Sequence, residues 1–582
     1  MKLCSLQRQR KAAILAGVFA AFAASSAGWQ STQSSPGEIT TREAPISFSS
    51  RVNLVSVPVV VRDSKGRAVG GLEKDDFQLL DSGKPQIVSG FSVEKFGSAD
   101  TTGAPSEIAG ESGGVSGAAV ASRMPSRFVA LVVDDLHTEF ADLVWAREAA
   151  EKFLASVPPS ERIALYTTSG QVGIDFTSDR DQLVKELRAI RSFVRQPTEC
   201  MRISYFIADR IRKEPCTADE FDGVRCPTKS AMAAEAAQCS AAAAQGTGPT
   251  IYAAAQRALA EGDLNTRQAM NTIRAVIGKL ATSPGQRQIV LISDGFLVLD
   301  EHRETETALF DDAIRAHVTV SSLDARGVKA YVPGGDASQH GVQTADAMRL
   351  ILQTEMWEAD TTAAVMDEAA NATGGRFFHG NNDMELGLER LAGVPDYVYV
   401  LAFAPQNLKF DGHYHALKVT LRNGKGLAVE ARRGYYAPNH ELSPAEQAKD
   451  EIQAAFFSTE ELRDLPASME TEFLKTGAYE ATVNVVARVD VKQLRYKQED
   501  GRNRNDVTIV CGLFDEDGNY VTGIQKVLEM RLRDETLADR LASGIAVKSS
   551  LKATPGKYIV RMVVRDSEGK ELTALTRALE IP

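Results

Sequence analysis

The feature that most constrains the fold is an unbroken apolar run, Phe128–Val133, that ends directly in polar side chains. The run reads FVALVV and is followed by Asp134, Asp135, His137 and Thr138. A short run of this kind, rich in Val and Leu, is typical of a strand buried on both faces of a parallel sheet. Open α/β sheets bind their ligands at the carboxyl ends of such strands. The polar residues after the run are therefore the first candidates for a functional site.

Strand and helix patterns alternate over residues 126–394, which predicts a doubly wound, largely parallel sheet with helices on both faces. Further strands are predicted at 162–168, 172–176, 288–295 and 318–327. Amphipathic stretches predict helices at 138–156, 179–190, 304–316 and 345–371. A Cys-rich insert, residues 195–249, interrupts this pattern, and it is followed by a helical pattern that begins at Thr250.

Two short β-rich segments, 48–96 and 395–438, flank the alternating region. Their β-branched runs and turn signals predict strands, but neither segment is large enough to bury a core alone. We therefore expect them to join as one immunoglobulin-like β-sandwich, with the α/β core inserted between them. The remaining divisions are a flexible segment 28–47, a Gly/Ser/Ala-rich linker 97–125, a helical linker 439–470 and a C-terminal β-sandwich 471–582.

The first residues predict export. A basic stretch is followed by the apolar run Ala12–Ala24 and by small residues before Gly28, which is the pattern of a signal peptide at 1–27. Thirteen apolar residues are too few to span a bilayer comfortably. We expect a periplasmic or secreted protein with no integral membrane segment after signal removal.

Four cysteines lie close together in the insert. Cys200, Cys216, Cys226 and Cys239 predict two disulfides in an oxidising compartment, in one of three connectivities. A zinc site is the alternative, but the close Cys pairs that zinc sites favour are missing. Cys511 follows a strand-like run and is expected to be a buried thiol.

Charge and motifs exclude several function classes. The net charge of −11 argues against nucleic-acid binding. The sequence has no nucleophile elbow, zinc-protease motif or phosphate-binding loop, so we expect no enzyme. His413 and His415 are two residues apart and are expected on one face of a strand. They could bind a metal as a pair, but exposed histidines on a strand are more common. Two alternatives stay open: an exported envelope hydrolase with its site in the insert or the C-terminal domain, and a structural envelope protein.

The α/β region resembles a von Willebrand factor type A (VWA) domain. The resemblance rests on the strand that ends in Asp134, on FTSDRDQLVKEL at 176–187 and on LISDGF at 291–296. With the flanking motifs LEKDDFQLLDSGKPQIVSGFSVE and VEARRGYYAP, the chain resembles the VWFA-related Acidobacterial domain family over about residues 50–438.

The resemblance implies a metal-ion-dependent adhesion site, which family members build from D-x-S-x-S, a distant Thr and a distant Asp. Asp134, Thr138, Thr250 and Asp294 take these positions, whereas Leu136 stands where the first Ser is expected. Mg²⁺ requires octahedral oxygen ligands, so the loss of one hydroxyl implies a degenerate site. The alternative is that these groups cap the following helix.

The expected function is protein–protein interaction or adhesion at the carboxyl edge of the parallel sheet. Asp134 and Asp294 mark this edge, and the disulfide-stapled insert is expected to shape the surface beside it. The expected partner is a protein, and Mg²⁺ is the one cofactor that the resemblance suggests.

Overall fold

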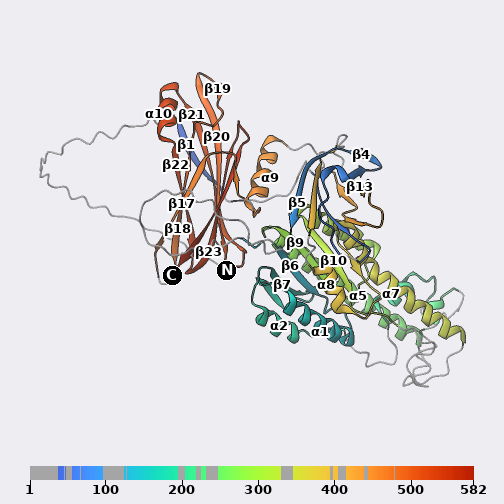
Figure 1. The fold of residues 1–582 in the computed structure, drawn as a ribbon. Helices are drawn as coiled ribbons and strands as arrows, with labels where there is room; N and C mark the ends of the chain where they lie inside the picture. The colour runs from blue at the N-terminus through green and yellow to red at the C-terminus, as the bar shows by residue number, and fades with distance from the viewer. Residues whose placement is uncertain are drawn as a thin grey trace, which may run out of the picture.

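The computed structural model describes residues 37–44, 55–95, 124–194, 203–217, 225–232, 247–329, 345–393, 397–403, 414–437 and 443–582, apart from single positions within these ranges, and also residues 46 and 405. The fold is mixed α/β (Figure 1). A parallel sheet with its helices lies beside two β-rich parts. Within the described ranges, no helix is long and apolar enough to cross a membrane.

The central sheet has six strands in the order β11-β10-β9-β6-β7-β8. They are β6 (Arg127–Val133), β7 (Arg162–Thr167), β8 (Gly173–Thr177), β9 (Gln286–Ser293), β10 (Val318–Asp324) and β11 (Phe377–Phe378). All neighbours pair in parallel except β7 and β8, which are antiparallel. The chain starts at the centre, winds out to β8, returns to β9 and then winds the other way. Because winding reverses between β6 and β9, their carboxyl ends define the switch point where such sheets bind ligands.

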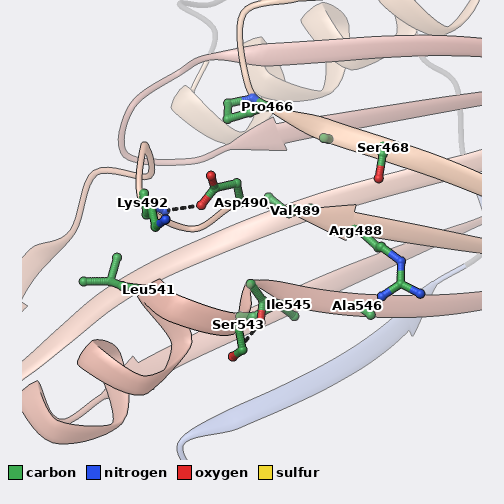
Figure 2. Close-up of a pocket in the computed structure, with 12 residues that line it drawn as sticks. Pro466, Ser468, Arg488, Val489, Asp490, Lys492, Leu541, Ser543, Ile545 and Ala546 are labelled. Carbon is green, nitrogen blue, oxygen red and sulfur yellow. Dashed lines mark hydrogen bonds between the residues drawn. The ribbon is translucent and has the colours of Figure 1, made fainter. Parts of the chain in front are cut away.

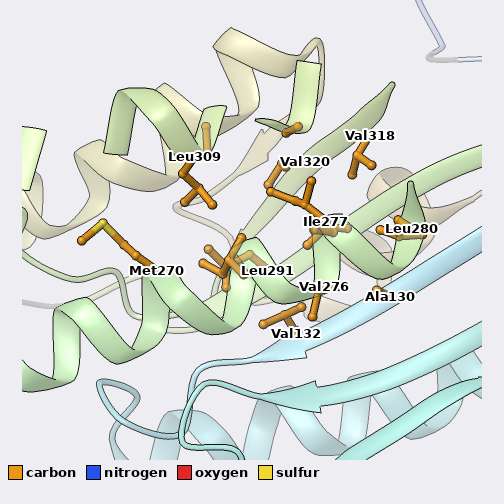
Figure 3. Close-up of a cluster of buried hydrophobic side chains, with 14 of the residues drawn as sticks. Ala130, Val132, Met270, Val276, Ile277, Leu280, Leu291, Leu309, Val318 and Val320 are labelled. Atoms are coloured by element: carbon orange, nitrogen blue, oxygen red, sulfur yellow. The ribbon is translucent and has the colours of Figure 1, made fainter. Parts of the chain in front are cut away.

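Helices cover both faces of this sheet. One face carries α1 (Phe140–Ser156), α2 (Arg180–Ala189) and α8 (Met384–Ala392). The other carries α5 (Thr247–Leu280), α6 (Arg303–Arg315) and α7 (Ala345–Thr373). Figure 3 shows how side chains of α5 and α6 meet those of β6, β9 and β10 in one apolar core. Every residue of β6 is buried, and all except Arg127 are apolar, as expected for a strand covered on both faces.

The two β-rich segments that flank the α/β region pair with each other, as expected from their size. One sheet has the order β14-β2-β12-β5 and the other β15-β13-β3-β4, so each contains strands from both segments. The strands are β2 (Val55–Arg62), β3 (Phe77–Asp81), β4 (Lys84–Gln86), β5 (Val88–Lys95), β12 (Tyr397–Phe403), β13 (Tyr414–Leu421), β14 (Ala428–Ala431) and β15 (Gly434–Tyr436), with a 3-10 turn η1 (Lys74–Asp76). One apolar core joins both sheets.

The C-terminal part has two antiparallel sheets on a shared apolar core. The larger contains β16 (Leu462–Arg463), β19 (Lys497–Glu499), β20 (Arg502–Asp515), β21 (Tyr520–Leu532), β23 (Gly556–Asp566) and β24 (Leu572–Ile581). The smaller contains β17 (Ala467–Lys475), β18 (Ala481–Val489) and β22 (Ile545–Ala553). The helix α9 (Pro444–Phe456) precedes them, beginning at the capping box of Ser443 and Glu446.

The structure differs from the sequence predictions at the edges of this part. The segment 28–47 was expected to be flexible, but Ile39–Ala44 forms β1, the edge strand beside β21. Glu38 pairs with Arg533 across this contact. Local sequence could not reveal a strand whose partner lies at the far end of the chain. The strands β16 and β17 also begin inside the expected helical linker 439–470, and α10 (Asp534–Ser543) was not predicted.

A turn of the C-terminal part contacts the amino-terminal end of the parallel sheet. Asp517 accepts hydrogen bonds from the backbone N–H and hydroxyl of Ser178, both at 3.1 Å, and forms an ion pair with Arg162 at 2.9 Å. Asn519 donates to the carbonyl of Phe176 at 3.0 Å. This turn therefore fastens the C-terminal sheets to the base of the α/β region, opposite the edge where its strands end.

Candidate functional site

The loops after β6 and β9 bring Asp134 and Asp294 to the switch point of the parallel sheet. Asp134 is fully buried and accepts hydrogen bonds from the hydroxyls of Thr168 at 2.7 Å and Ser293 at 2.6 Å. Both hydroxyls lie at the ends of neighbouring strands, β7 and β9. The first Asp of the predicted site is thus held by the sheet itself.

His137 supplies the third contact to Asp134. Its Nδ1 lies 3.0 Å from each oxygen of Asp134, and its ring stacks on Phe296 with centroids 5.1 Å apart. Burial opposes ionisation of Asp134, yet the imidazole and the two hydroxyls together hold the pKa of this carboxyl below its usual value. A side chain of the same loop therefore contacts both oxygens of the carboxylate.

Asp135 is bound from the neighbouring loop after β7. It accepts the backbone N–H of Ser169 at 2.8 Å and the hydroxyl of the same residue. The sequence analysis did not single out Thr168, Ser169 and Ser293, because none of them takes a position of the adhesion-site pattern. The signal that could have found them is a hydroxyl at the carboxyl end of each strand that borders β6.

Thr138 and Asp294 join the two loops and the start of α1. The Thr138 hydroxyl accepts the backbone N–H of Asp294 at 3.3 Å, and Asp294 Oδ2 accepts the N–H of Glu139 at 2.9 Å. Asp294 thus caps α1 from another strand, in place of the local capping that the sequence suggested. Gly295, with φ of +82°, allows the tight turn, and a Cβ there would lie 2.3 Å from the carbonyl oxygen of Thr362.

Thr250 is not brought to this site, which corrects the sequence assignment. It is exposed near the start of α5. The residues of α5 that contact the site loops are Gln268 and Thr272, which donate to the carbonyls of Ser169 and Thr168. Thr250 precedes Gln268 by about five turns, which is about 27 Å along a helix. Because the long insert precedes this helix, the sequence assigned the distant Thr to the start of the helix, which lies away from the site.

The residues present do not fit a Mg²⁺ site. Leu136 offers no side-chain oxygen, and Thr250, the expected distant Thr, is exposed near the start of α5. Both oxygens of Asp134 already accept hydrogen bonds, and the Asp135 side chain is turned to Ser169. A divalent ion that demands six oxygens in octahedral geometry would have to displace most of these bonds.

Exposed apolar side chains lie at the start of α1 and in two of the loops at the carboxyl edge of the sheet. Phe140, the first residue of α1, is 60% exposed, and Phe193, whose backbone N–H donates to the carbonyl of Asp135 at 2.7 Å, is 52% exposed. Val328, beyond β10, and Trp145, further along α1, are also exposed. Large apolar groups in water at one edge are typical of a contact surface.

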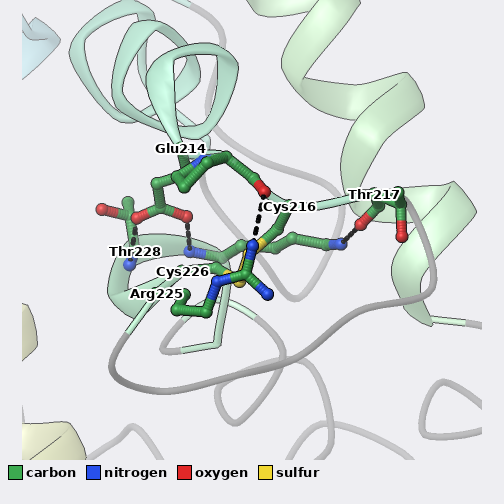
Figure 4. The surroundings of a disulfide bond; sticks show 8 residues. Glu214, Cys216, Thr217, Arg225, Cys226 and Thr228 are labelled. Atoms are coloured by element: carbon green, nitrogen blue, oxygen red, sulfur yellow. Dashed lines mark hydrogen bonds between the residues drawn. A yellow bond between two sulfur atoms is a disulfide. The ribbon is translucent and has the colours of Figure 1, made fainter.

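The insert lies against the same edge. Its helix α3 (Tyr205–Lys213) packs on α5 and on Leu297 and Leu299, which follow β9. Cys216 and Cys226 form a disulfide, while Cys200 and Cys239 fall outside the described residues. Figure 4 shows Glu214 beside this bond, where it accepts the backbone N–H groups of Thr228 and Lys229.

A second polar cluster lies between α5 and the 3-10 turn η2 (Asp300–His302). The ligand atoms of Asp263, Glu301 and His302 lie within 4.8 Å of one another. Each carboxylate already faces an arginine, Arg267 at 2.7 Å from Asp263 and Arg212 at 3.8 Å from Glu301. This arrangement is a charge network whose negative groups are balanced by the protein.

Other sequence candidates have structural roles. His415 lies 3.2 Å from Asp81 and packs on Tyr435, whereas His413 falls outside the described residues. Cys511 is a buried thiol whose pKa is raised to about 12 by burial.

An open groove of about 470 Å³ in the C-terminal part is lined by Ser468, Arg488 and Asp490, among others, with no His or Cys in its lining (Figure 2).

The comparisons with known proteins do not assign a family. No family model and no curated protein matches the chain. Among solved structures, the human COPII-coat protein Sec24c is similar at a TM-score of 0.17 and 9% identity, over 79% of this chain and 44% of that one. The BSP domain of a biofilm-associated protein is similar at a TM-score of 0.10 and 11% identity, over 32% of this chain and 43% of that one. The chain spans less than half the length of each, and likeness at this level carries no argument.

Proposed function

We propose that the chain is an exported VWA-domain protein that binds a protein partner at the carboxyl edge of its parallel sheet, without catalysis. The observation that supports this most is the exposure of Phe140, Phe193 and Val328, which all follow the loops at this edge, with Trp145 further along α1. Aromatic groups are enriched in the energetically dominant centres of protein interfaces. A surface of this composition favours a protein partner over nucleic acid.

The VWA assignment is supported by the doubly wound strand order and by the position of Asp134 and Asp294 on either side of the switch point. The joined β-segments fit the proposed immunoglobulin-like sandwich from which the α/β region would emerge. Export is supported by the Cys216–Cys226 disulfide, because such bonds persist in oxidising compartments.

Binding at this edge is proposed to be independent of Mg²⁺. The support is the set of hydrogen bonds that already satisfy Asp134 and Asp135. The adhesion role implied by the resemblance would therefore not require a metal. The hydrogen-bonded loops at Asp134 and Asp135 and the exposed apolar residues beside them would provide the contact.

Capture of a partner from envelope extracts by the immobilised protein tests the proposal. Phe140→Ser with Phe193→Ser is expected to lower the captured amount at least about tenfold, because such hot-spot residues each contribute about 1–2 kcal/mol or more. Tyr479→Ser, at an exposed aromatic of the C-terminal part, is the matched control and is expected to have no effect. Equal capture by the double variant and the control would refute the docking site.

A further inference from the structure

A buried arginine at the junction between the joined β-segments and the α/β region has no acceptor for its charge. Arg432 lies between β14 and β15 and is only 8% exposed. Its Nε is buried and has no hydrogen-bond partner among the described residues. The described groups that act electrostatically on this guanidinium are two tyrosines, Tyr414 and Tyr435, and no carboxylate is among them. A buried charge without a partner costs free energy, so an anion that binds here would remove this cost.

The end of α7 fixes the place of this arginine. Thr373 is the last residue of the helix, and its hydroxyl accepts the backbone N–H of Val320 in β10 at 2.9 Å. Gly374 follows with φ of +80°, and a Cβ there would lie 2.8 Å from the backbone nitrogen and 2.9 Å from the Cα of Arg432. The backbone of Arg432 is therefore packed directly against the α/β region, beside β10.

A second arginine and a histidine lie at the same end of the parallel sheet. Arg287, at the start of β9, donates to the backbone carbonyls of Ser283 and Ala316 at 2.8 and 2.9 Å, and these neutral acceptors do not balance its charge. The exposed His317 directly precedes β10, close enough to Arg432 and Arg287 for both charges to act on it. Burial lowers the pKa of both arginines to about 10, so each keeps its charge at neutral pH.

A phosphate group suits this set of side chains. Guanidinium groups bind phosphate oxygens through charge-assisted hydrogen bonds, and the two charges of a phosphate match those of two arginines. The three side chains come from β9, from the turn before β10 and from the connection between β14 and β15. A tetrahedral anion can accept from donors on several segments, whereas a carboxylate offers two oxygens in one plane. His317 is the exposed member of the set, so a ligand reaches Arg432 from the side of the imidazole.

We propose that Arg432, Arg287 and His317 bind a phosphate group, either as inorganic phosphate or as part of a larger molecule. The site lies where β9 and β10 begin, at the end of the sheet opposite the edge proposed to bind a protein partner. The inference goes beyond the proposed function and does not depend on it. Because Arg432 belongs to the joined β-segments and the other two residues to the α/β region, the bound anion would also fasten these parts to each other.

Calorimetry of the full chain in a phosphate-free buffer tests the proposal. The probes are inorganic phosphate, glycerol 3-phosphate and acetate. We expect phosphate to bind at least about tenfold more tightly than acetate, the difference that one charge-assisted hydrogen bond provides. Arg432→Gln is expected to weaken phosphate binding by at least about the same factor. Arg433→Gln, at the exposed neighbouring arginine, is the matched control and should leave it unchanged.

The two phosphate probes separate the sources of the anion. Tighter binding of glycerol 3-phosphate would assign the phosphate to a larger molecule, and tighter binding of inorganic phosphate would assign the site to the free anion. Should Arg432→Gln fail to fold, His317→Gln at an exposed position takes its place, with an expected weakening of phosphate binding of at least about threefold.

Thermal unfolding gives a second measurement. Phosphate is expected to raise the unfolding temperature of the wild type and of Arg433→Gln but not of Arg432→Gln. Without phosphate, Arg432→Gln should be at least as stable as the wild type, because it removes a buried charge that has no partner. Four results would overturn the inference: no binding of phosphate by the wild type, equal binding of acetate, unchanged phosphate binding by Arg432→Gln, or a marked loss of stability in that variant without phosphate.

Discussion

The Nδ1 atom of His137 lies 3.0 Å from both carboxylate oxygens of Asp134. The two residues share one loop, and the carboxylate is fully buried beneath the ring. The contact to both carboxylate oxygens is therefore provided by a neighbouring side chain of the same loop.

His137→Ala is expected to lower the free energy of unfolding at pH 7 by about 3 kcal/mol, because it removes the partner of a buried charge. His137→Asn, which can still donate from a similar position, is the control and should lose less. Urea unfolding measures both. Since the pKa of Asp134 is below its usual value, the stabilisation of its ionised form is complete above about pH 4 and is lost at lower pH. An alanine variant as stable as the wild type would contradict this role.

Asp311 on α6 predicts a pH dependence of the opposite sign. Burial raises its pKa to about 6, and its Oδ1 has no hydrogen-bond partner among the described residues. A raised carboxyl pKa makes stability fall as the pH rises from about 4 to 6, because the folded state binds more protons there. Asp311→Asn is expected to gain up to about 1 kcal/mol at about pH 7.5, after allowance for solvent screening, and nothing at about pH 3.5. Thermal unfolding at the two pH values measures the difference, and an equal effect at both would contradict the assignment.

The contact of Asp517 with Ser178 and Arg162 is expected to couple the unfolding of the C-terminal sheets to that of the α/β region. Asp517→Ala removes three polar contacts and should separate or broaden the transition in scanning calorimetry, with a loss of about 1–3 kcal/mol. Glu516→Ala is the matched control, because Glu516 contributes its backbone carbonyl to Arg162 and its side chain is exposed. A single unchanged transition in the Asp517 variant would show that the contact does not couple them.

The edge strand β1 predicts that residues near the start of the chain protect the C-terminal sheet. A protein that begins at Ile46 is expected to exchange the amides of residues 525–530 faster than one that begins at Gly28, because their partners in β1 are lost. Hydrogen exchange of the peptide that covers β21 measures this, with β23, paired on both sides within the sheet, as the internal control. Equal exchange in both proteins would show that β1 does not pair stably.

The sequence was sufficient for the order of elements in the α/β region, because buried parallel strands appear as apolar runs and their covering helices as amphipathic stretches. It also placed Asp134, Thr138 and Asp294 together, since they follow neighbouring strands. It gave only a weak signal that Thr168 and Ser293 bind Asp134, because hydroxyls at strand ends are common and only the place of these two beside β6 sets them apart. Nor could it predict that β1 pairs with β21 or that Thr250 lies away from the candidate site. Both depend on how segments far apart in the sequence are arranged in space.

A protein partner is proposed to contact the carboxyl edge of the parallel sheet without a metal. The most direct measurement is photo-cross-linking in envelope extracts from p-benzoylphenylalanine placed at Phe193, with Tyr479 as the control position. Both side chains are exposed, so the probe fits at either place. We expect one discrete adduct from position 193 that persists in EDTA and is missing from position 479. An adduct from position 193 that EDTA abolishes, or one that forms only from position 479, would contradict it.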